Sequence, residues 1–218
     1  MKEFMPGFSD SLRRVVSSVA VLLETVYGNQ VPPSLQVGNY SGPMTDWGIQ
    51  GEVKTSQAWI DSGDSTVLVI SEIQKGQPND KAFRSEVFGY RYTKRNEKWT
   101  KDFSIKEANQ SPNEIVHYQS GSTFVKDVDG IGGAETGFFY SVAMDGGTES
   151  LVLKMIFHWN GKKAPIRGKI PRELDADGIY QMTLDPQLKT APQEIRDFAV
   201  GHWKAYVKAK YGELVPNP

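Results

Sequence analysis

The chain has 218 residues, a length that suits one domain or one domain with an appended segment. Its 25 Lys and Arg residues balance 26 Asp and Glu residues, so the formal net charge is −1 and the basic excess typical of nucleic-acid-binding proteins is missing. The absence of Cys excludes disulfides, thiol catalysis, iron–sulfur clusters and cysteine-ligated zinc.

Residues 1–30 differ from the rest of the chain and admit two interpretations. An arginine pair followed by the largely apolar stretch 15–23 is similar to a secretory leader, which would place the mature protein in the periplasm or outside the cell. Alternatively, residues 10–27 form an amphipathic helix that ends at Gly28, and the protein is cytoplasmic. The apolar stretch is shorter than the roughly 20 residues that cross a bilayer, so no transmembrane span is expected.

From residue 35 to residue 184 the pattern is one of strands and turns. Four consecutive apolar residues at 67–70 predict a strand that is buried on both faces. Asn160 and Gly161 predict a type I′ hairpin turn, because both residues accept positive φ angles. Strands are expected over 57–60, 65–73, 86–93, 98–105, 122–125, 136–143, 151–159 and 164–170, with a last strand after residue 178.

Strands that recur at roughly ten-residue spacing indicate an antiparallel all-β core. The sequence therefore predicts a mainly β fold, an antiparallel sandwich or a partly open barrel, in a single domain over residues 31–218. A C-terminal helix is expected over 191–211, with Thr190 and Gln193 as a capping box and Gly212 as its end. Its apolar face would pack on the sheet or close one end of a barrel; that face consists of Ile195, Phe198, Ala199, His202, Trp203, Tyr206 and Val207.

One loop between two expected strands carries residues with a recognisable chemistry. Calcium loops bring oxygen ligands together on a short turn, with carboxylates at alternate positions and Gly at the sixth. Asp127 and Asp129 occupy the first and third positions of such a loop, and Glu135 occupies the ninth. Gly132 stands at the sixth, but Ile131 fills the fifth, where an oxygen ligand is needed. The pattern predicts a degenerate calcium-loop-like turn with Asp127, Asp129 and Glu135 as candidate metal ligands.

The same stretch has a simpler interpretation as a glycine-rich β-turn whose Asp side chains bond nearby backbone N–H groups. Two weaker acidic turns occur, at 61–64 and at 175–178, and turns are also the simplest interpretation of both. The three histidines, His117, His158 and His202, lack the spacing of a metalloprotease site. Nucleophile-elbow, P-loop and dinucleotide-binding motifs are also missing from the sequence.

Two further possibilities concern carbohydrate. The five Trp and nine Tyr residues could line a carbohydrate groove, although core and cross-strand pairs are their more common use. A glycosidase-type pair of carboxylates, such as Glu72 or Glu135 with an Asp, depends on spatial separation that the sequence does not give.

Several segments together resemble a bacterial family of surface polysaccharide biosynthesis proteins. The runs 125–140, 151–158 and 161–168 are similar to the family's D-x-D-x-D-G-x-x-E, L-K-L and K-K-x-x-x-R-G segments, and 59–72 is similar to its earlier hairpin. The resemblance spans roughly residues 50–210. It implies a secreted, periplasmic or lipid-anchored protein with residues 1–30 as leader, although the chain has no Cys to carry a lipid, and it transfers no catalytic residue.

Three hypotheses follow from the sequence. The first is a non-enzymatic envelope protein that binds a glycan or an envelope protein, with calcium as its only candidate cofactor and no nucleic-acid partner. The second is a carbohydrate-active enzyme that uses a carboxylate pair. The third is an interaction or immunity-type module, which an exposed apolar patch of several hundred Å² would favour.

Overall fold

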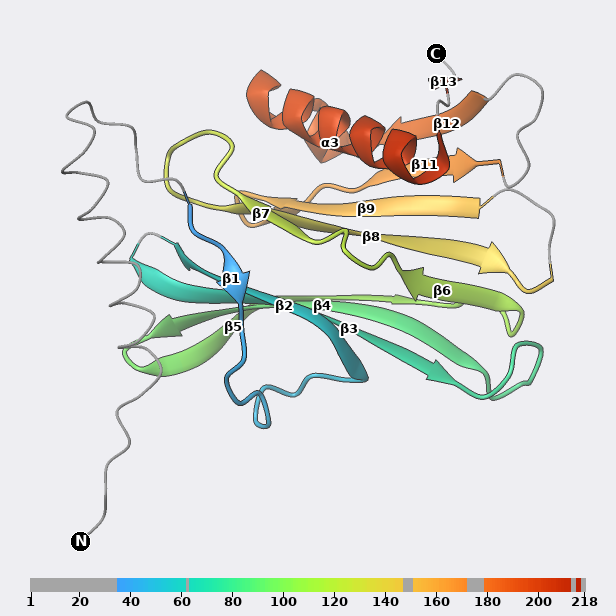
Figure 1. Ribbon diagram of the computed structural model, residues 1–218, viewed down its shortest axis with the longest axis horizontal. Helices are drawn as coiled ribbons and strands as arrows, with labels where there is room; N and C mark the ends of the chain where they lie inside the picture. Colours follow the sequence, from blue (N-terminus) through green and yellow to red (C-terminus); the bar gives the residue numbers. More distant parts are fainter. Residues whose placement is uncertain (1–34, 62, 147–150, 172–178, 213–214, 217–218) are drawn as a thin grey trace, which may run out of the picture.

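The computed structural model describes all residues except 1–34, 62, 147–150, 172–178, 213–214 and 217–218. It contains two stacked sheets, antiparallel apart from one short parallel pair at the C-terminal end, and a C-terminal helix over the outer face of the second sheet (Figure 1). This confirms the mainly β fold, and of the two expected architectures the structure has the two-sheet form. The possible helix over 10–27 lies outside the described residues.

The first sheet has the strand order β1-β2-β3-β4-β5, so neighbours along the chain are also neighbours in the sheet. The hairpins pair in register around tight turns, with Asp61 opposite Asp64 and Arg95 opposite Lys98. The strands of the first sheet are β1 (Gly38–Asn39), β2 (Glu52–Asp61), β3 (Asp64–Lys75), β4 (Arg84–Arg95) and β5 (Lys98–Ala108).

The second sheet has the order β13-β12-β11-β9-β8-β6, with β7 also pairing with β8 and β10 with β9. Asn160 and Gly161 both have positive φ, 45° and 70°, which confirms the type I′ turn after β9. The elements of the C-terminal half are β6 (Glu114–Tyr118), β7 (Phe124–Lys126), β8 (Glu135–Met144), β9 (Leu151–Trp159), β10 (Lys162–Lys163), β11 (Ile166–Ile170), β12 (Ile179–Leu184), α2 (Pro186–Lys189), α3 (Gln193–Tyr211) and β13 (Val215–Pro216).

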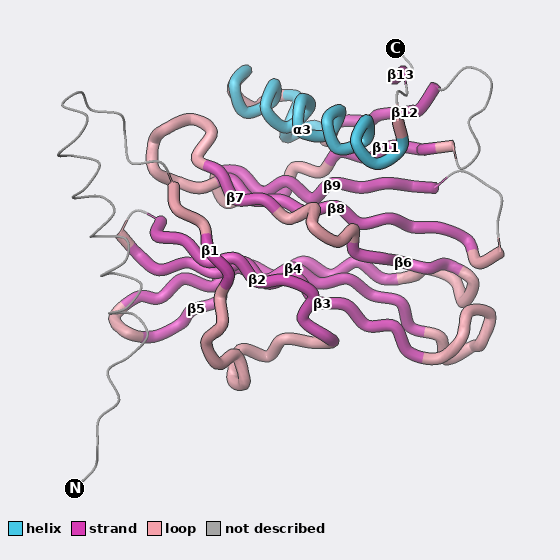
Figure 2. Tube along the Cα trace, in the orientation of Figure 1, coloured by secondary structure: helices cyan, strands magenta, loops and turns pink. Residues whose placement is uncertain are grey.

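Strand β3 has apolar side chains on both of its faces, as the run 67–70 predicts. Leu68 and Ile70 belong to the core between the two sheets, whereas Val67 and Val69 belong to a second core on the outer face of the first sheet. The backbone from residue 40 to residue 50 covers that outer face and lies below the first sheet in the tube view (Figure 2). Both faces of β3 are therefore closed to solvent.

Helix α3 packs on the second sheet through Ile195, Ala199, Trp203 and Val207, all of them buried. The spacing of these residues matches the predicted apolar face, and Gly212 ends the helix as expected. Close packing depends on Gly168 of β11, because a Cβ there would lie 2.6 Å from Trp203 Cζ2. Among the described residues, no helix is long and apolar enough to cross a membrane.

The predicted start of this helix was wrong. The helix begins at Gln193 after Pro192, and no side chain caps it there. The Thr190 hydroxyl instead donates to the carbonyls of Pro186 and Gln187, so it closes the end of the short helix α2. A capping box requires its hydroxyl to accept a backbone N–H of the helix that follows, but the N-cap of α3 is Pro192, two residues after Thr190.

Candidate functional site

Residues 127–135, here called the acidic loop, join β7 to β8. Lys126 at the end of β7 pairs directly with Glu135 at the start of β8, so the chain leaves and re-enters the sheet at one point. Gly130 and Gly132 have φ angles of 70° and 91°, a region that glycine enters without steric cost. The two glycines let the loop reverse tightly and bring its acidic residues near one another.

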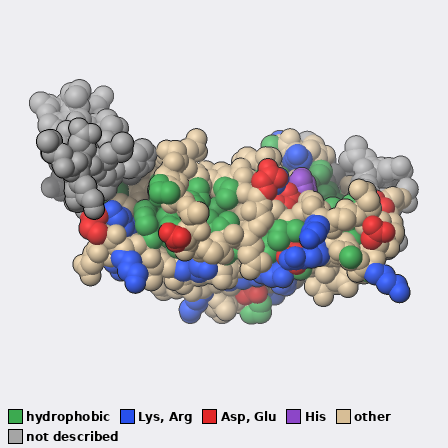
Figure 3. All heavy atoms as spheres, turned by 90° about the horizontal axis from the view of Figure 1, so that it is seen from below, with side chains coloured by type: hydrophobic (Ala, Val, Ile, Leu, Met, Phe, Trp, Pro, Cys, Tyr) green, Lys and Arg blue, Asp and Glu red, His purple; other side chains and the backbone are tan. Residues whose placement is uncertain are grey.

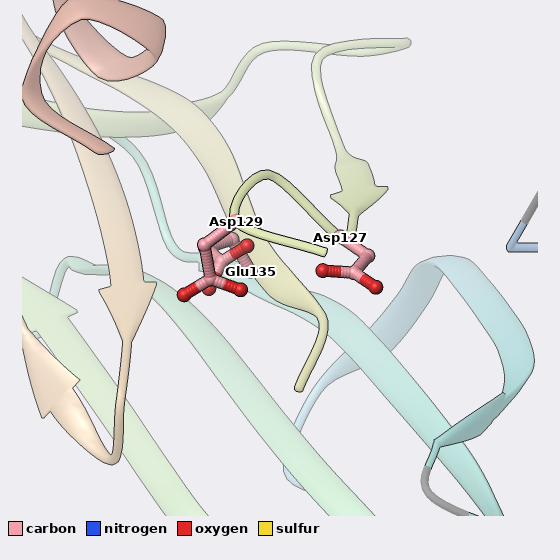
Figure 4. A group of neighbouring side chains, drawn as sticks. All are labelled: Asp127, Asp129 and Glu135. Carbon is pink, nitrogen blue, oxygen red and sulfur yellow. The ribbon is translucent and has the colours of Figure 1, made fainter. Parts of the chain in front are cut away.

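The structure brings the three candidate ligands together. Asp127, Asp129 and Glu135 each offer a carboxylate oxygen, and these oxygens lie within 4.8 Å of one another. Figure 4 shows the side chains of Asp129 and Glu135 close together, with Asp127 to one side of them, just after the end of β7. Glu135 is only 2% exposed, whereas the two aspartates are partly exposed. Ile131 is 84% exposed and contributes no ligand from its side chain.

Hydrogen bonds within the loop agree with its interpretation as a glycine-rich turn. Asp127 Oδ1 accepts from Gly130 N at 2.8 Å, and Asp129 Oδ1 accepts from Ile131 N at 3.2 Å. Glu135 Oε2 accepts from Val128 N at 2.8 Å. A carboxylate can accept several contacts at once, so these bonds fit both a turn and an oxygen cage for a cation. Cation binding here stays a prediction.

The electrostatics of the loop are unusual at Glu135. Burial raises the pKa of its carboxyl to about 7, and the negative charges of Asp129 and Asp127 act in the same direction. The N–H of Val128 opposes the shift without cancelling it. Near neutral pH this carboxyl is therefore divided between its protonated and ionised forms, and a bound cation would favour ionisation.

The weaker acidic turn at 61–64 has no free pair of carboxylates. Asp61 is buried and forms an ion pair with Arg91, which also lies 3.6 Å from Asp102 Oδ2. Asp64 lies instead 3.7 Å from the guanidinium of Arg95. These acids neutralise arginines, which agrees with the simpler interpretation of that turn. The third acidic stretch, 175–178, lies outside the described residues.

A second polar group was not foreseen from the sequence, because β6 was not predicted. Glu72 on β3 accepts from His117 Nδ1 at 2.8 Å and from Tyr118 N at 3.2 Å, both on β6. The Lys54 ammonium lies 3.8 Å from Glu72 Oε2. Glu72 is 4% exposed. Its buried carboxylate therefore links the first sheet to the edge strand of the second sheet. We call this contact the seam.

Two more side chains of the first sheet complete the seam. Ser85 Oγ accepts from Val116 N at 2.7 Å and lies 2.8 Å from Val116 O, to which Gln74 Nε2 also donates at 2.8 Å. Strand β6 is the last strand of its sheet, so these backbone groups have no neighbouring strand to bond. Polar side chains of β3 and β4 satisfy this edge in place of another strand.

The seam shifts the pKa values of both partners. Burial alone would raise the pKa of Glu72, but the contacts with His117, Gln74 and Tyr118 N outweigh it and lower the pKa. The hydrogen bond to Glu72 raises the pKa of His117, whose side chain is 58% exposed. Beside the seam lies an open hollow of about 260 Å³ lined by Gly51, Glu52, Lys54, Glu72, Ile73 and Gln74.

The other two histidines serve as packing residues. His158 stacks on Phe103 with ring centroids 4.1 Å apart, and His202 lies 4.1 Å from the ring of Phe124. Burial lowers the pKa of both, to about 4 for His158. Within the described part of the chain, the acidic loop is the one group of three or more His, Asp or Glu side chains placed to hold a metal ion.

Four aromatic residues form a cluster on the outer face of the first sheet, here called the outer aromatic cluster: Tyr40, Trp47, Tyr92 and Trp99. The Trp47 ring lies 4.3 Å from Tyr92, 4.9 Å from Trp99 and 5.3 Å from Tyr40, centroid to centroid. Tyr92 is buried beneath and donates its hydroxyl hydrogen to the Trp47 carbonyl. The other three rings remain partly exposed. Figure 3 views this side of the molecule and shows hydrophobic side chains gathered there among Lys and Arg side chains.

No family model, curated protein or solved structure matches the chain.

Proposed function

We propose that this protein is a non-enzymatic binding protein of the bacterial envelope, and that its ligand is a glycan held on the outer aromatic cluster. The observation that carries the proposal is the partial exposure of three neighbouring rings, those of Tyr40, Trp47 and Trp99, on the outer face of the first sheet. The C–H faces of a pyranose ring pack against aromatic rings, and the Trp N–H and Tyr hydroxyl groups can bond sugar hydroxyls.

The cluster is held in place before any ligand arrives. Trp47 comes from the segment that covers the sheet, and Trp99 comes from β5, yet both rings contact one another and Tyr40. The hydroxyl of Tyr92 fixes the backbone of Trp47 from below. Because the rings are already ordered, a sugar that stacks on them loses little binding energy to side-chain ordering.

The resemblance of residues 50–210 to surface polysaccharide biosynthesis proteins supports the same class of partner. On this proposal residues 1–30 are a leader and the mature protein is periplasmic or secreted. The acidic loop then has a supporting role, as a turn or as a calcium site that stiffens the connection between β7 and β8.

The carbohydrate-active enzyme remains a second candidate because of one observation. Glu135 has a pKa of about 7 and lies beside Asp129, which is the combination of a proton donor and a second carboxylate that glycosidases use. Glu135 is nevertheless only 2% exposed, so a sugar in solvent has little access to its carboxyl. Binding without turnover is therefore the function that the geometry supports better.

The interaction or immunity-type module has less support. Among the described residues, the exposed large hydrophobic side chains are Val37, Val53 and Ile131. Single apolar residues of this kind occur on most protein surfaces and do not mark an interface.

Glycan binding can be tested by affinity electrophoresis of the full chain in gels that contain soluble polysaccharides, both neutral (dextran) and acidic (polygalacturonate). Wild type should be retarded by at least one of them, and Trp47→Leu should abolish the retardation. Trp159→Leu is the matched control, because Trp159 is a partly exposed Trp of the second sheet. Circular dichroism checks that both variants fold.

Retardation that persists in Trp47→Leu, or its absence in wild type with both polysaccharides, would overturn the proposal. If wild type hydrolyses either polysaccharide and Glu135→Gln does not, the protein would instead be a carbohydrate-active enzyme.

A further inference from the structure

The lysine side chains beside the outer aromatic cluster give it a preference for charge. Lys101 lies on β5 opposite Tyr92, and its ammonium stands 5.3 Å from the ring centroid of Tyr90 and 5.7 Å from that of Tyr92. It is exposed, and within the described part of the chain no carboxylate lies within ion-pair distance of it. The Lys101 charge is therefore available to a ligand.

Neighbouring positions on the same face extend this positive edge. Lys106, further along β5, stands 5.7 Å from the ring centroid of Phe88 and 3.1 Å from Glu86 Oε1. Arg84 pairs with the same carboxylate at 2.8 Å, so two basic groups share one acid. Figure 3 shows Lys and Arg side chains spread along this side of the molecule. A chain that lies along β4 and β5 would meet more positive than negative charge.

We propose that the ligand of the outer aromatic cluster is an acidic polysaccharide, with a sugar ring stacked on Trp99 and a carboxylate paired with Lys101. This rests on the proposed function and names its ligand class. Trp99 and Lys101 are two residues apart on one strand, so their side chains lie on the same face of the sheet. The covering segment carries the exposed acid Asp46, so an anionic chain should lie on the β5 side of the cluster.

Lysines on an edge strand also have a simpler explanation, which is protection of the sheet edge. Strand β5 is the last strand of the first sheet, and charged side chains on such strands discourage pairing with other molecules. That role requires only a charge, with no acid partner and no aromatic neighbour. The position of Lys101 over two rings, next to Trp99, is what separates the ligand role from edge protection.

A nucleic acid or an anionic membrane could meet the same lysines. Binding to a nucleic acid or an anionic membrane usually requires a general electrostatic attraction. With a net charge of −1, this protein offers none to either of them. A polysaccharide of uronic acids needs only a few charge contacts beside stacked rings, so we favour it.

The test compares wild type, Lys101→Met and Lys204→Met in metal-free buffer, with polygalacturonate, dextran, single-stranded oligonucleotide and phosphatidylglycerol vesicles as probes. Lys204 is an exposed lysine on α3, at the other side of the molecule. Wild type should bind polygalacturonate more tightly than dextran, and added salt should weaken that binding. Lys101→Met should weaken it about threefold to fivefold, while Lys204→Met should leave it unchanged.

Three results would overturn this inference. Equal binding of dextran and polygalacturonate would remove the acidic preference and leave glycan binding standing. Equal losses in Lys101→Met and Lys204→Met would show a non-specific charge effect. Oligonucleotide or vesicle binding that depends on Lys101 and exceeds polygalacturonate binding would replace the ligand class. If neither polysaccharide binds, the proposed glycan binding itself fails. This outcome differs from a failure of the acidic preference alone, in which dextran still binds.

Discussion

Two buried glutamates, Glu135 in the acidic loop and Glu72 at the seam, show opposite electrostatic behaviour. Burial by itself acts to raise the pKa of both carboxyls. At Glu72 the contacts with His117, Gln74 and Tyr118 N together outweigh burial, whereas at Glu135 two neighbouring aspartates add to it. The nature of the partners therefore decides the charge of a buried carboxyl in this protein. Glu72 contributes to the fold as an anion, whereas Glu135 is partly protonated near neutral pH.

Removing the carboxylate of Glu72 should have the largest effect on stability. Glu72→Leu leaves the Tyr118 N–H without its acceptor and separates His117 from the first sheet. We expect the free energy of unfolding to fall by about 3 kcal/mol, in line with the loss of a buried, hydrogen-bonded charge. Urea denaturation measures this change.

Glu52→Leu is the matched control, because Glu52 is an acid whose side chain is 75% exposed. It should change stability by less than about 0.5 kcal/mol. Equal losses in the two variants would show that Glu72 holds no special position at the seam.

Calcium should stabilise the protein if the acidic loop is an ion site. A cation that binds only the native state raises the free energy of unfolding by about 2.7 kcal/mol at a hundredfold excess over Kd. Thermal unfolding of wild type with and without calcium measures this shift, and Asp129→Asn should lose it. An unchanged wild-type melting temperature would leave the glycine-rich turn as the whole account of the loop.

Glu135 should destabilise the protein at alkaline pH when no cation is bound. Its pKa of about 7 in the folded state lies above the ordinary value of 4.5, so the folded state holds a proton that the unfolded state has released. Stability is then lost as the pH rises from about 4.5 through 7. Glu135→Gln should remove this loss. The difference in unfolding free energy, variant minus wild type, should therefore be about 2 kcal/mol larger at pH 8 than at pH 5.

Urea denaturation at the two pH values, in buffer with a chelator, gives the comparison. A pH dependence equal in wild type and variant would contradict the raised pKa. With calcium added, wild type should recover at pH 8 and Glu135→Gln should recover less, provided that the loop binds the ion.

The acidic loop could be predicted from sequence, whereas the seam could not. Asp127, Asp129 and Glu135 lie within nine consecutive positions, and the glycines between them mark a turn, so local spacing was enough to place them together. Glu72 and His117 are 45 positions apart, and they meet only because β6 forms the edge of the second sheet above β3. Turn residues flank Glu114–Tyr118 on both sides, but the strand was missed because it has only five residues.

The same contrast explains the hairpins and the helix cap. The hairpin at Asn160 was predicted correctly, because its φ angles follow from the two turn residues alone. The prediction that Thr190 caps α3 was wrong. Whether its hydroxyl bonds α2 or α3 depends on where the carbonyls of residues 186 and 187 lie in the fold. The outer aromatic cluster lies between these cases. The number of Trp and Tyr residues raised the possibility of an aromatic groove, but these four rings meet only because the segment before β2 folds back over the sheet.

The smallest expected effect concerns His117, which tests the seam from the exposed side. The hydrogen bond to Glu72 raises its pKa above the ordinary 6.5, while burial and the charges of Lys54 and Lys210 oppose the shift. Its contribution to stability is therefore complete below about pH 6.5 and is lost as the pH rises through the folded-state value. Glu72 sets the acid limit, since its lowered pKa means that its contribution is lost as the pH falls below about 4.5.

His117→Gln keeps a donor for Glu72 but cannot carry the charge. Wild type should exceed the variant in stability at pH 5.5 by less than about 1 kcal/mol, because an ion pair this exposed is well screened, and the advantage should vanish at pH 8.5. Urea denaturation at the two pH values measures it. This alkaline loss resembles that at Glu135 in direction but has the opposite origin, since here a positive partner is discharged and there a carboxyl becomes charged. Glu135→Gln should therefore leave the His117 effect unchanged, and a double variant that deviates from additivity would show that the two glutamates are coupled through the sheets.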